Sequence, residues 1–138
     1  PYGRPDMALY KFINNIKKNK PITLYNKGDH ERDFTYIDDV VYSIIKVMKH
    51  SFGKQKYNII NVSGSSTVKL KEFVKIIEKN LKILAKKKYV KMQIGDVYKN
   101  YADNSKLKKI IGKYKFTKIE KGIEQFIRWY NEYNGNKS

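Results

Sequence analysis

The 138-residue chain contains no cysteine, one tryptophan and only three prolines. The absence of cysteine excludes disulfides and thiolate metal sites, and it suits a cytoplasmic protein. No apolar run approaches the roughly 18 residues that a membrane span needs, and no signal peptide opens the chain. We therefore expect no membrane partner. Because the chain begins with Pro1 rather than Met, we expect a fragment or processed part of a longer protein.

Acidic residues are also scarce: the chain has 13 acidic and 30 basic residues, so its net charge is +17. Such a charge raises the alternative of a basic domain that binds nucleic acid or another polyanion. The basic residues are 27 Lys and only 3 Arg, whereas nucleic-acid surfaces usually rely on Arg. Lys71, Lys75, Lys79 and Lys82 recur at helical spacing, which is typical of a solvated helix face. We therefore expect no nucleic-acid partner.

Catalytic motifs are missing as well. The two histidines, His30 and His50, have no spacing that suggests paired metal ligands, so we expect no metal site. No glycine-rich phosphate-binding loop occurs, because the longest Gly-Ser stretch, "SGSS", has a single glycine. Tyr-x-x-x-Lys occurs three times, but chance predicts roughly two such pairs at this composition. We therefore expect no catalytic residue and no cofactor-binding residue in this chain.

The apolar fraction of 41% indicates a folded protein, and its periodicity predicts an α/β domain over residues 1–138. A helix is expected to open at Pro5–Asp6 and to stop before Pro21, and another is expected to begin with Asp38 as its cap. The other expected elements are strands at 22–26, 57–62 and 89–94, an extended segment at 32–36, a long helix carrying Leu70 to Leu84, a short helix capped by Asp103 or Asn104 before Gly112, and a last helix after Thr117.

Arg32 is the residue whose type needs an explanation, because it lies in "GDHERDFTYIDD" among five acids. One interpretation is that Arg32 only pairs with a neighbouring acid. The other is that its planar fork of donors binds a carboxylate or phosphate two at a time, which a lysine cannot do. Arg4 also lies in a loop and is open to the second interpretation. Arg128, in mid-helix beside Glu124, is expected to form a simple ion pair.

Five segments of the sequence resemble the C-terminal portion of nucleotide-sugar epimerases and dehydratases, which are extended short-chain dehydrogenase/reductases. The resemblance runs almost end to end and keeps the family's order and spacing. It is closest to the UDP-glucuronate 4-epimerases. The segments are "YGRPDMALYKF" (2–12), "PITLYNKGDHERDFTYIDDVV" (21–41), "YNIINV" (57–62), "QIGDVYKNYADNSKLKKIIG" (93–112) and "IEKGIEQFIRWYNEY" (119–133).

The resemblance implies a set of substrate-binding residues. Arg32, the Arg of the "RDF" motif, would contact the diphosphate of a UDP-sugar, and Asp96 would accept hydrogen bonds from ribose hydroxyls. Arg4 would bind the sugar carboxylate of UDP-glucuronate, with a helix N-terminus beside it. The remaining implied residues are Lys11 near Arg4, Ile22, Leu24 and Tyr25 along the uracil pocket, largely through backbone groups, and Gln93 at the UDP end.

The resemblance also implies parts that are not in this sequence. The family's N-terminal Rossmann domain carries NAD and the catalytic Tyr and Lys, so this part alone is expected to be inactive. The parent would be a homodimer, and the fragment is expected to be a monomer. The expected activity of the parent is interconversion of UDP-glucuronate and UDP-galacturonate for polysaccharide precursors, in the cytoplasm. A UDP-hexose 4-epimerase or a sugar-nucleotide 4,6-dehydratase remains an alternative.

Overall fold

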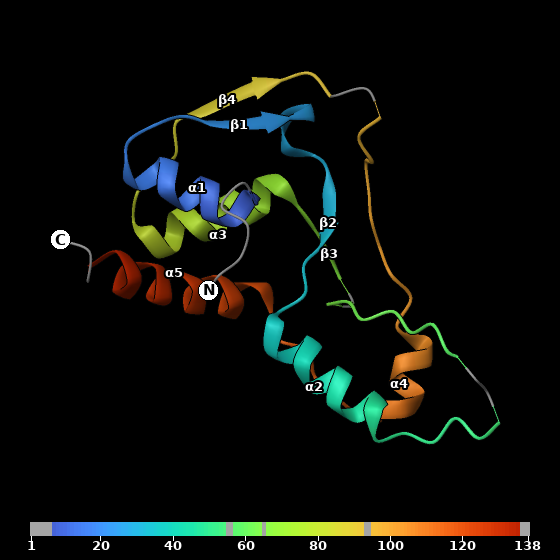
Figure 1. Ribbon diagram of the computed structural model, residues 1–138. Coiled ribbons are helices and arrows are strands. Elements are labelled where there is room, and N and C mark those ends of the chain that lie inside the picture. The colour runs from blue at the N-terminus through green and yellow to red at the C-terminus, as the bar shows by residue number, and fades with distance from the viewer. Residues whose placement is uncertain (1–6, 55–56, 65, 93–94, 136–138) are drawn as a thin grey trace.

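Five helices and two pairs of short strands make up the part of the chain described by the computed structural model, which is residues 7–54, 57–64, 66–92 and 95–135 (Figure 1). In chain order the elements are α1 (Ala8–Lys17), β1 (Ile22–Tyr25), the 3-10 turn η1 (Asn26–Gly28), β2 (Glu31–Asp33), α2 (Ile37–Met48), β3 (Thr67–Lys69), α3 (Leu70–Leu81), β4 (Lys87–Val90), α4 (Ser105–Ile111) and α5 (Ile119–Gly135). The predicted α/β class is confirmed.

The strands form two separate two-stranded sheets, one parallel and one antiparallel. β1 and β4 run parallel, with Ile22 opposite Lys87 and Tyr25 opposite Val90. β2 and β3 run antiparallel, with Arg32 opposite Val68. The chain between β1 and β4 includes β2, α2, β3 and α3, which gives the parallel pair the long connection that it requires.

The core lies among α1, α3, α5 and β1. Figure 1 shows α1 and α3 between the β1–β4 pair and α5. Each helix buries residues three or four positions apart, as an amphipathic helix does. The apolar residues of this cluster that are less than one-tenth exposed are Phe12, Ile13, Ile16, Ile22, Leu24, Phe73, Val74, Ile77, Ile123, Ile127 and Tyr130.

The helix interiors were predicted better than the helix ends. The N-cap of α2 is Tyr36, and Asp38 lies in the first turn, so the prediction of Asp38 as the cap was wrong. Leu84 lies beyond the end of α3 and its side chain is 85% exposed, because Lys82 takes a left-handed conformation that ends the helix. The cap of α4 is Asn104, one of the two predicted candidates, and Gly112 follows α4 with a positive φ of 69°.

The predicted buried strand at 57–62 was also wrong. This segment is irregular, and Tyr57 and Ile59 are 88% and 84% exposed. A strand needs a neighbour that satisfies its backbone, and none of the described strands pairs with this segment. The local composition therefore identified a segment with high strand propensity, but a strand partner is not present among the described residues.

Asp39 fastens the start of α2 to the segment that leads into α5. Its side chain is only 1% exposed. Its carboxylate accepts hydrogen bonds from the Tyr114 hydroxyl at 2.7 Å, from the Thr117 backbone N–H at 2.8 Å and from the Thr117 hydroxyl at 3.0 Å. The hydrogen bond to Asp39 and partial burial raise the pKa of Tyr114 to about 12. The acid is thus a buried and fully paired anchor rather than a surface charge.

None of the helices in the described part of the chain has the length and apolar character that crossing a bilayer requires.

Candidate functional site

The candidate site is built on β2, which a left-handed turn positions. Asn26, Lys27 and Gly28 all have positive φ values, and Gly28 lies so close to α3 that an added Cβ would be 3.2 Å from the backbone nitrogen of Lys71. Glycine suits this position because it accepts the positive φ and the close approach. The turn brings the chain from β1 into β2, where His30 and Arg32 lie two residues apart and therefore on the same side of the extended backbone.

A second segment, residues 95–100, runs along β2 on the side away from β3. The Glu31 backbone N–H donates to the Tyr98 carbonyl at 2.9 Å, and the Asn100 N–H donates to the Glu31 carbonyl at 3.2 Å. The Asn100 side chain also accepts from the Asp33 N–H at 2.9 Å. These bonds hold Asp96 beside β2 although it lies 64 residues away along the chain from Arg32.

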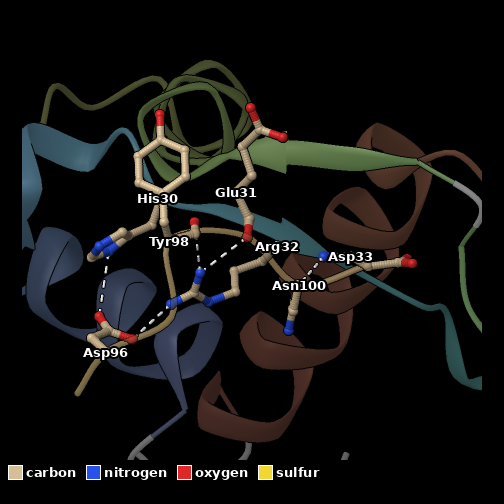
Figure 2. Close-up of polar contacts among 7 residues, drawn as sticks. All are labelled: His30, Glu31, Arg32, Asp33, Asp96, Tyr98 and Asn100. Carbon is tan, nitrogen blue, oxygen red and sulfur yellow. Dashed lines mark hydrogen bonds and ion pairs between the residues drawn. The ribbon is translucent and has the colours of Figure 1, made fainter. Parts of the chain in front are cut away.

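Arg32 and Asp96 form the ion pair at the centre of the site, shown in Figure 2. Nη2 of Arg32 donates to Oδ1 of Asp96 at 3.0 Å, and Nη1 donates to the carbonyls of Glu31 at 3.0 Å and Tyr98 at 3.3 Å. The two side chains are 27% and 29% exposed. A guanidinium has more N–H donors than these three bonds use, so a ligand can still be bound by Arg32 while the pair with Asp96 persists.

The acids beside Arg32 in sequence have partners other than this arginine, which argues against a simple pair with a neighbouring acid. Asp29 accepts from Lys71 at 2.7 Å, and Glu31 pairs with Lys99 at 2.9 Å. The Lys71 and Lys99 ammonium groups lower the pKa of Asp29 and of Glu31, respectively. Figure 2 shows the Glu31 carboxylate pointing away from the Arg32 guanidinium.

Asp33 and Asp39, two further acids of this stretch, also accept hydrogen bonds from groups other than Arg32. Asp33 accepts from the Gly64 N–H at 2.9 Å, and Asp39 is bonded to Tyr114 and Thr117 as described above. The arginine is therefore not a local ion pair with a neighbouring acid. By contrast, Arg128 does pair with its neighbour Glu124, at 3.4 Å, as its sequence position predicted.

His30 is the residue of this site that the sequence did not single out. Its side chain is 3% exposed, and its Nδ1 lies 3.4 Å from Oδ2 of Asp96, on the side of the carboxylate that Arg32 does not use. Its Nε2 is buried without a hydrogen-bond partner among the described residues. The Tyr98 ring lies edge-on to the imidazole at 6.1 Å. Two cationic or polar groups thus fix the orientation of one carboxylate. The only signal for this role in the sequence was the i, i+2 spacing of His30 and Arg32.

Of the predicted site residues that the structure describes, it joins Arg32 with Asp96 in an ion pair. Lys11 is exposed on α1, and Tyr25 is half-buried at the end of β1. Ile22 and Leu24 are 0% and 1% exposed, so their side chains belong to the core and only their backbone groups are available to a ligand. Arg4 and Gln93 lie outside the described residues.

Two other features bear on the chemistry of the described residues. A mostly apolar cavity of about 850 Å³ lies between α1, the segment 34–38 and α5, and Arg32 and Asp96 do not line it. No group of three or more His, Cys, Asp and Glu side chains gathers in the described part of the chain in a way that could hold a metal ion. The half-buried ion pair of Arg32 on β2 with Asp96 is therefore the best-defined candidate for binding a small charged ligand.

Comparison with known proteins gives consistent matches for this chain. The family described as the NAD dependent epimerase/dehydratase family matches residues 1–63. An uncharacterized protein of Methanocaldococcus jannaschii is 48% identical over 131 residues, which are 95% of this chain and 39% of that protein. UDP-glucuronate 4-epimerase 1 of Arabidopsis thaliana is 40% identical over 98% of this chain and 35% of its own length.

The fold has a counterpart among solved structures. The UDP-glucuronic acid 4-epimerase of Bacillus cereus, solved in complex with UDP-glucuronic acid and NAD, superimposes with a TM-score of 0.78 and is 28% identical. That match covers 94% of this chain and 42% of the enzyme. The chain thus spans about two-fifths of the length of the proteins that it matches. These matches confirm the resemblance that the sequence segments indicated.

Proposed function

We propose, on the premise that this chain resembles the C-terminal portion of the NAD-dependent nucleotide-sugar epimerases and dehydratases, that residues 1–138 are the UDP-sugar-binding part of a nucleotide-sugar 4-epimerase. UDP-glucuronate is the proposed substrate, in interconversion with UDP-galacturonate. The proposal draws on the UDP-glucuronate 4-epimerases among the relatives and on the structural match to an enzyme in complex with UDP-glucuronic acid.

The contact between Arg32 and Asp96 is the observation that carries the proposal. The resemblance nominated these two residues for neighbouring parts of one ligand, the diphosphate and the ribose. Their side chains approach to 3.0 Å although 64 positions separate them. Arg32 would bind the diphosphate with the N–H donors that Asp96 and the two carbonyls leave available, since a guanidinium matches phosphate oxygens two at a time. Its partial exposure gives a ligand access to these donors.

Asp96 would bind the ribose on the same side of β2. Each carboxylate oxygen has two lone pairs, so the oxygens that contact Arg32 and His30 can also accept from ribose hydroxyls. Arg32 and His30 would keep this carboxylate in one orientation before the ligand arrives, which lowers the entropy lost on binding. The ribose and the diphosphate are adjacent in UDP, as Asp96 and Arg32 are adjacent here.

NAD would be bound outside these residues. A dinucleotide site needs a glycine-rich turn whose backbone approaches the pyrophosphate, and the eight glycines of this chain occur singly and far apart. The residues present therefore do not fit NAD. In the parent enzyme the cofactor would supply hydride transfer at the sugar. This chain would hold the UDP end of the substrate, and by itself it would not turn over.

Calorimetric titration of the chain with UDP, UMP and uridine tests this proposal. We expect UDP to bind, and uridine to bind at least about tenfold more weakly because it lacks the charge-assisted bonds to Arg32. Arg32→Lys is expected to weaken UDP binding about tenfold, since the ammonium keeps the charge but loses the fork. Arg128→Lys is the matched control, because Arg128 pairs with its helix neighbour Glu124 on α5.

Two results would contradict the proposal. One is equal affinity of both variants for UDP. The other is the absence of UDP binding at millimolar concentration together with tight, steeply salt-dependent binding of a random oligonucleotide, which would support the polyanion alternative.

A further inference from the structure

The Asp96 carboxylate has an arginine at one oxygen and a histidine at the other. Its Oδ1 accepts from Nη2 of Arg32 at 3.0 Å, and its Oδ2 lies 3.4 Å from Nδ1 of His30 (Figure 2). The imidazole is therefore one carboxylate away from the guanidinium that would bind the diphosphate of the ligand. At such separations two charged groups still influence each other, because the energy between charges falls only as the inverse of their distance.

The His30 imidazole is already enclosed by the protein. Its side chain is 3% exposed, whereas those of Arg32 and Asp96 are 27% and 29% exposed. The Tyr98 ring covers it edge-on. A ligand that covers Arg32 and Asp96 therefore removes little further water from His30, and it acts on this residue mainly through its charge.

The two ring nitrogens of His30 have different surroundings. Nδ1 faces the Asp96 carboxylate, so it carries a proton whether the ring is neutral or charged. Nε2 is buried and has no hydrogen-bond partner among the described residues. A donor beside Nε2 would hold the ring neutral, and an acceptor there would hold it charged. With neither in place, the charge of the ring can respond to a charge that is added nearby.

The other charged groups on the elements around His30 are acids and lysines, which keep their charge near neutral pH. Hydrogen bonds from Lys71 and Lys99 lower the pKa of Asp29 and Glu31, respectively, and Asp29 raises the pKa of Lys71. Histidine is the residue type that ordinarily changes its charge between about pH 5 and 8. Besides Arg32 and Asp96, the groups concerned are Asp29 and Glu31 on either side of His30, Lys27 on η1, Lys69 on β3, Lys71 on α3 and Lys99 in the segment 95–100.

The charges at the centre of the site cancel only while His30 is neutral. Arg32 and Asp96 form an ion pair, and a protonated His30 would leave this group of three with a net positive charge. The diphosphate of a nucleotide sugar is an anion on both phosphoryl groups. Its arrival at Arg32 therefore stabilises the protonated imidazole. Because coupling between two binding events is reciprocal, a proton on His30 strengthens diphosphate binding by the same factor.

We infer that binding of the UDP-sugar is coupled to uptake of a proton by His30, so that the affinity rises as the pH falls through the range in which the imidazole titrates. This inference rests on the proposed function, because it takes the diphosphate to lie at Arg32. His30 contacts Asp96 rather than the ligand, and it is therefore a positioning residue whose charge also sets the affinity of the site.

Calorimetric titration with UDP-glucuronate, in buffers that differ in ionisation enthalpy, counts the protons taken up on binding. This ligand is the suitable probe because its diphosphate diester and its carboxylate stay ionised between about pH 6 and 8, whereas the terminal phosphate of UDP titrates there. We expect about 0.4 proton per bound ligand at pH 7, and about fourfold tighter binding at pH 6 than at pH 8. Both effects are expected to disappear in His30→Gln and to persist in His50→Gln, the matched control, whose ring lies against Phe52.

A second measurement needs no variant of His30. Because the chain has two histidines, their ring Cε1–H groups give two resonances in a proton spectrum, and His50→Gln identifies one of them. Saturating UDP-glucuronate is expected to move the titration curve of His30 to higher pH and to leave that of His50 in place.

Binding of UDP-glucuronate without proton uptake would overturn the inference and leave the proposed function intact. Proton uptake that persists in His30→Gln, or equal movement of both histidine titration curves, would overturn it as well. Failure of UDP-glucuronate to bind the chain at all would overturn the proposed function and this inference together.

Discussion

The helices α2 and α3 have the same length, twelve residues, and opposite surroundings. Helix α3 buries Phe73, Val74 and Ile77 in the core and exposes its lysines. Helix α2 buries Asp39 and exposes its large apolar side chains, which are Ile37, Val41, Ile44, Ile45 and Met48. The amphipathic pattern therefore predicts that each segment is a helix, but it does not say what the apolar face contacts. The same contrast extends to the two regions of the molecule, since α3 belongs to the α1–α3–α5 core and α2 packs chiefly on α4 (Figure 1).

The largest expected difference between the regions is the loss in the free energy of unfolding when one isoleucine in each is truncated to alanine. Ile77→Ala on α3 is expected to lower the free energy of unfolding by about 3 kcal/mol, because it leaves a cavity in a fully buried site. Ile44→Ala on α2 is expected to change it by less than about 0.5 kcal/mol, because that side chain is half exposed. Urea unfolding followed by circular dichroism measures both. Equal losses in the free energy of unfolding would show that the apolar side chains on the outside of α2 are already buried in solution.

The next effect concerns two adjacent acids of α2. Asp39→Ala is expected to lower the free energy of unfolding by about 2 kcal/mol, because it leaves the Tyr114 hydroxyl and the Thr117 N–H without their acceptor. Asp38→Ala, at the exposed neighbouring position in the same turn, is expected to cost about 0.5 kcal/mol through the helix dipole alone. The same urea unfolding compares them. A ranking in which Asp38 costs as much as Asp39 would refute the anchoring role of Asp39.

A pH effect follows from the same anchor. Asp39 raises the pKa of Tyr114 from 10.0 to about 12, so the folded state holds this proton more tightly than the unfolded state. The stability from this bond is fully present below pH 10 and is lost as the pH rises through about 12. Carbon NMR of the tyrosine rings is expected to show Tyr114 titrating near pH 12, and Asp39→Asn is expected to bring its pKa back down. An unchanged Tyr114 titration in that variant would contradict the assignment.

Much of the α1–α3–α5 region was predictable from the sequence because its signals are local. Phe12, Ile13 and Ile16 recur at helical spacing, and they are the residues that α1 buries. The prediction failed where the determining contact is distant. The strand predicted at 57–62 lacks a partner among the described residues. The end of α3 was missed for a local reason, because Lys82 takes a left-handed conformation and Leu84 lies beyond it.

The site was predictable in part for the same reason. Arginine stood out by its rarity, and the resemblance to a family supplied Asp96. That these two residues meet, and that His30 lies against the same carboxylate, depends on the chain from 95 to 100 running along β2. Neither residue spacing nor composition encodes that long-range pairing. The neighbouring acids in the sequence suggested themselves as partners of Arg32. In the structure these acids bind lysines and backbone N–H groups instead.

The smallest expected effect is a difference in UDP binding between variants of the two histidines, His30 beside β2 and His50 after α2. His30→Gln is expected to weaken UDP binding about threefold, because the Asp96 carboxylate loses one of the groups that orient it. His50→Gln, at the exposed end of α2 where the ring contacts Phe52, is expected to leave UDP binding unchanged. Calorimetry at fixed salt compares them, and unfolding curves check that both variants stay folded. The same affinity for UDP in both would remove His30 from the site.

The most direct measurement of the central claim uses the scarcity of arginine. Because the chain has three arginines, its side-chain Nε–H groups give three resonances in a proton–nitrogen spectrum. Titration with UDP is expected to shift the resonance of Arg32 and to leave that of Arg128 in place, and UDP-glucuronate is expected to shift that of Arg4 in addition. A UDP titration to millimolar concentration that leaves the Arg32 resonance unmoved, or that moves Arg32 and Arg128 equally, would contradict the account.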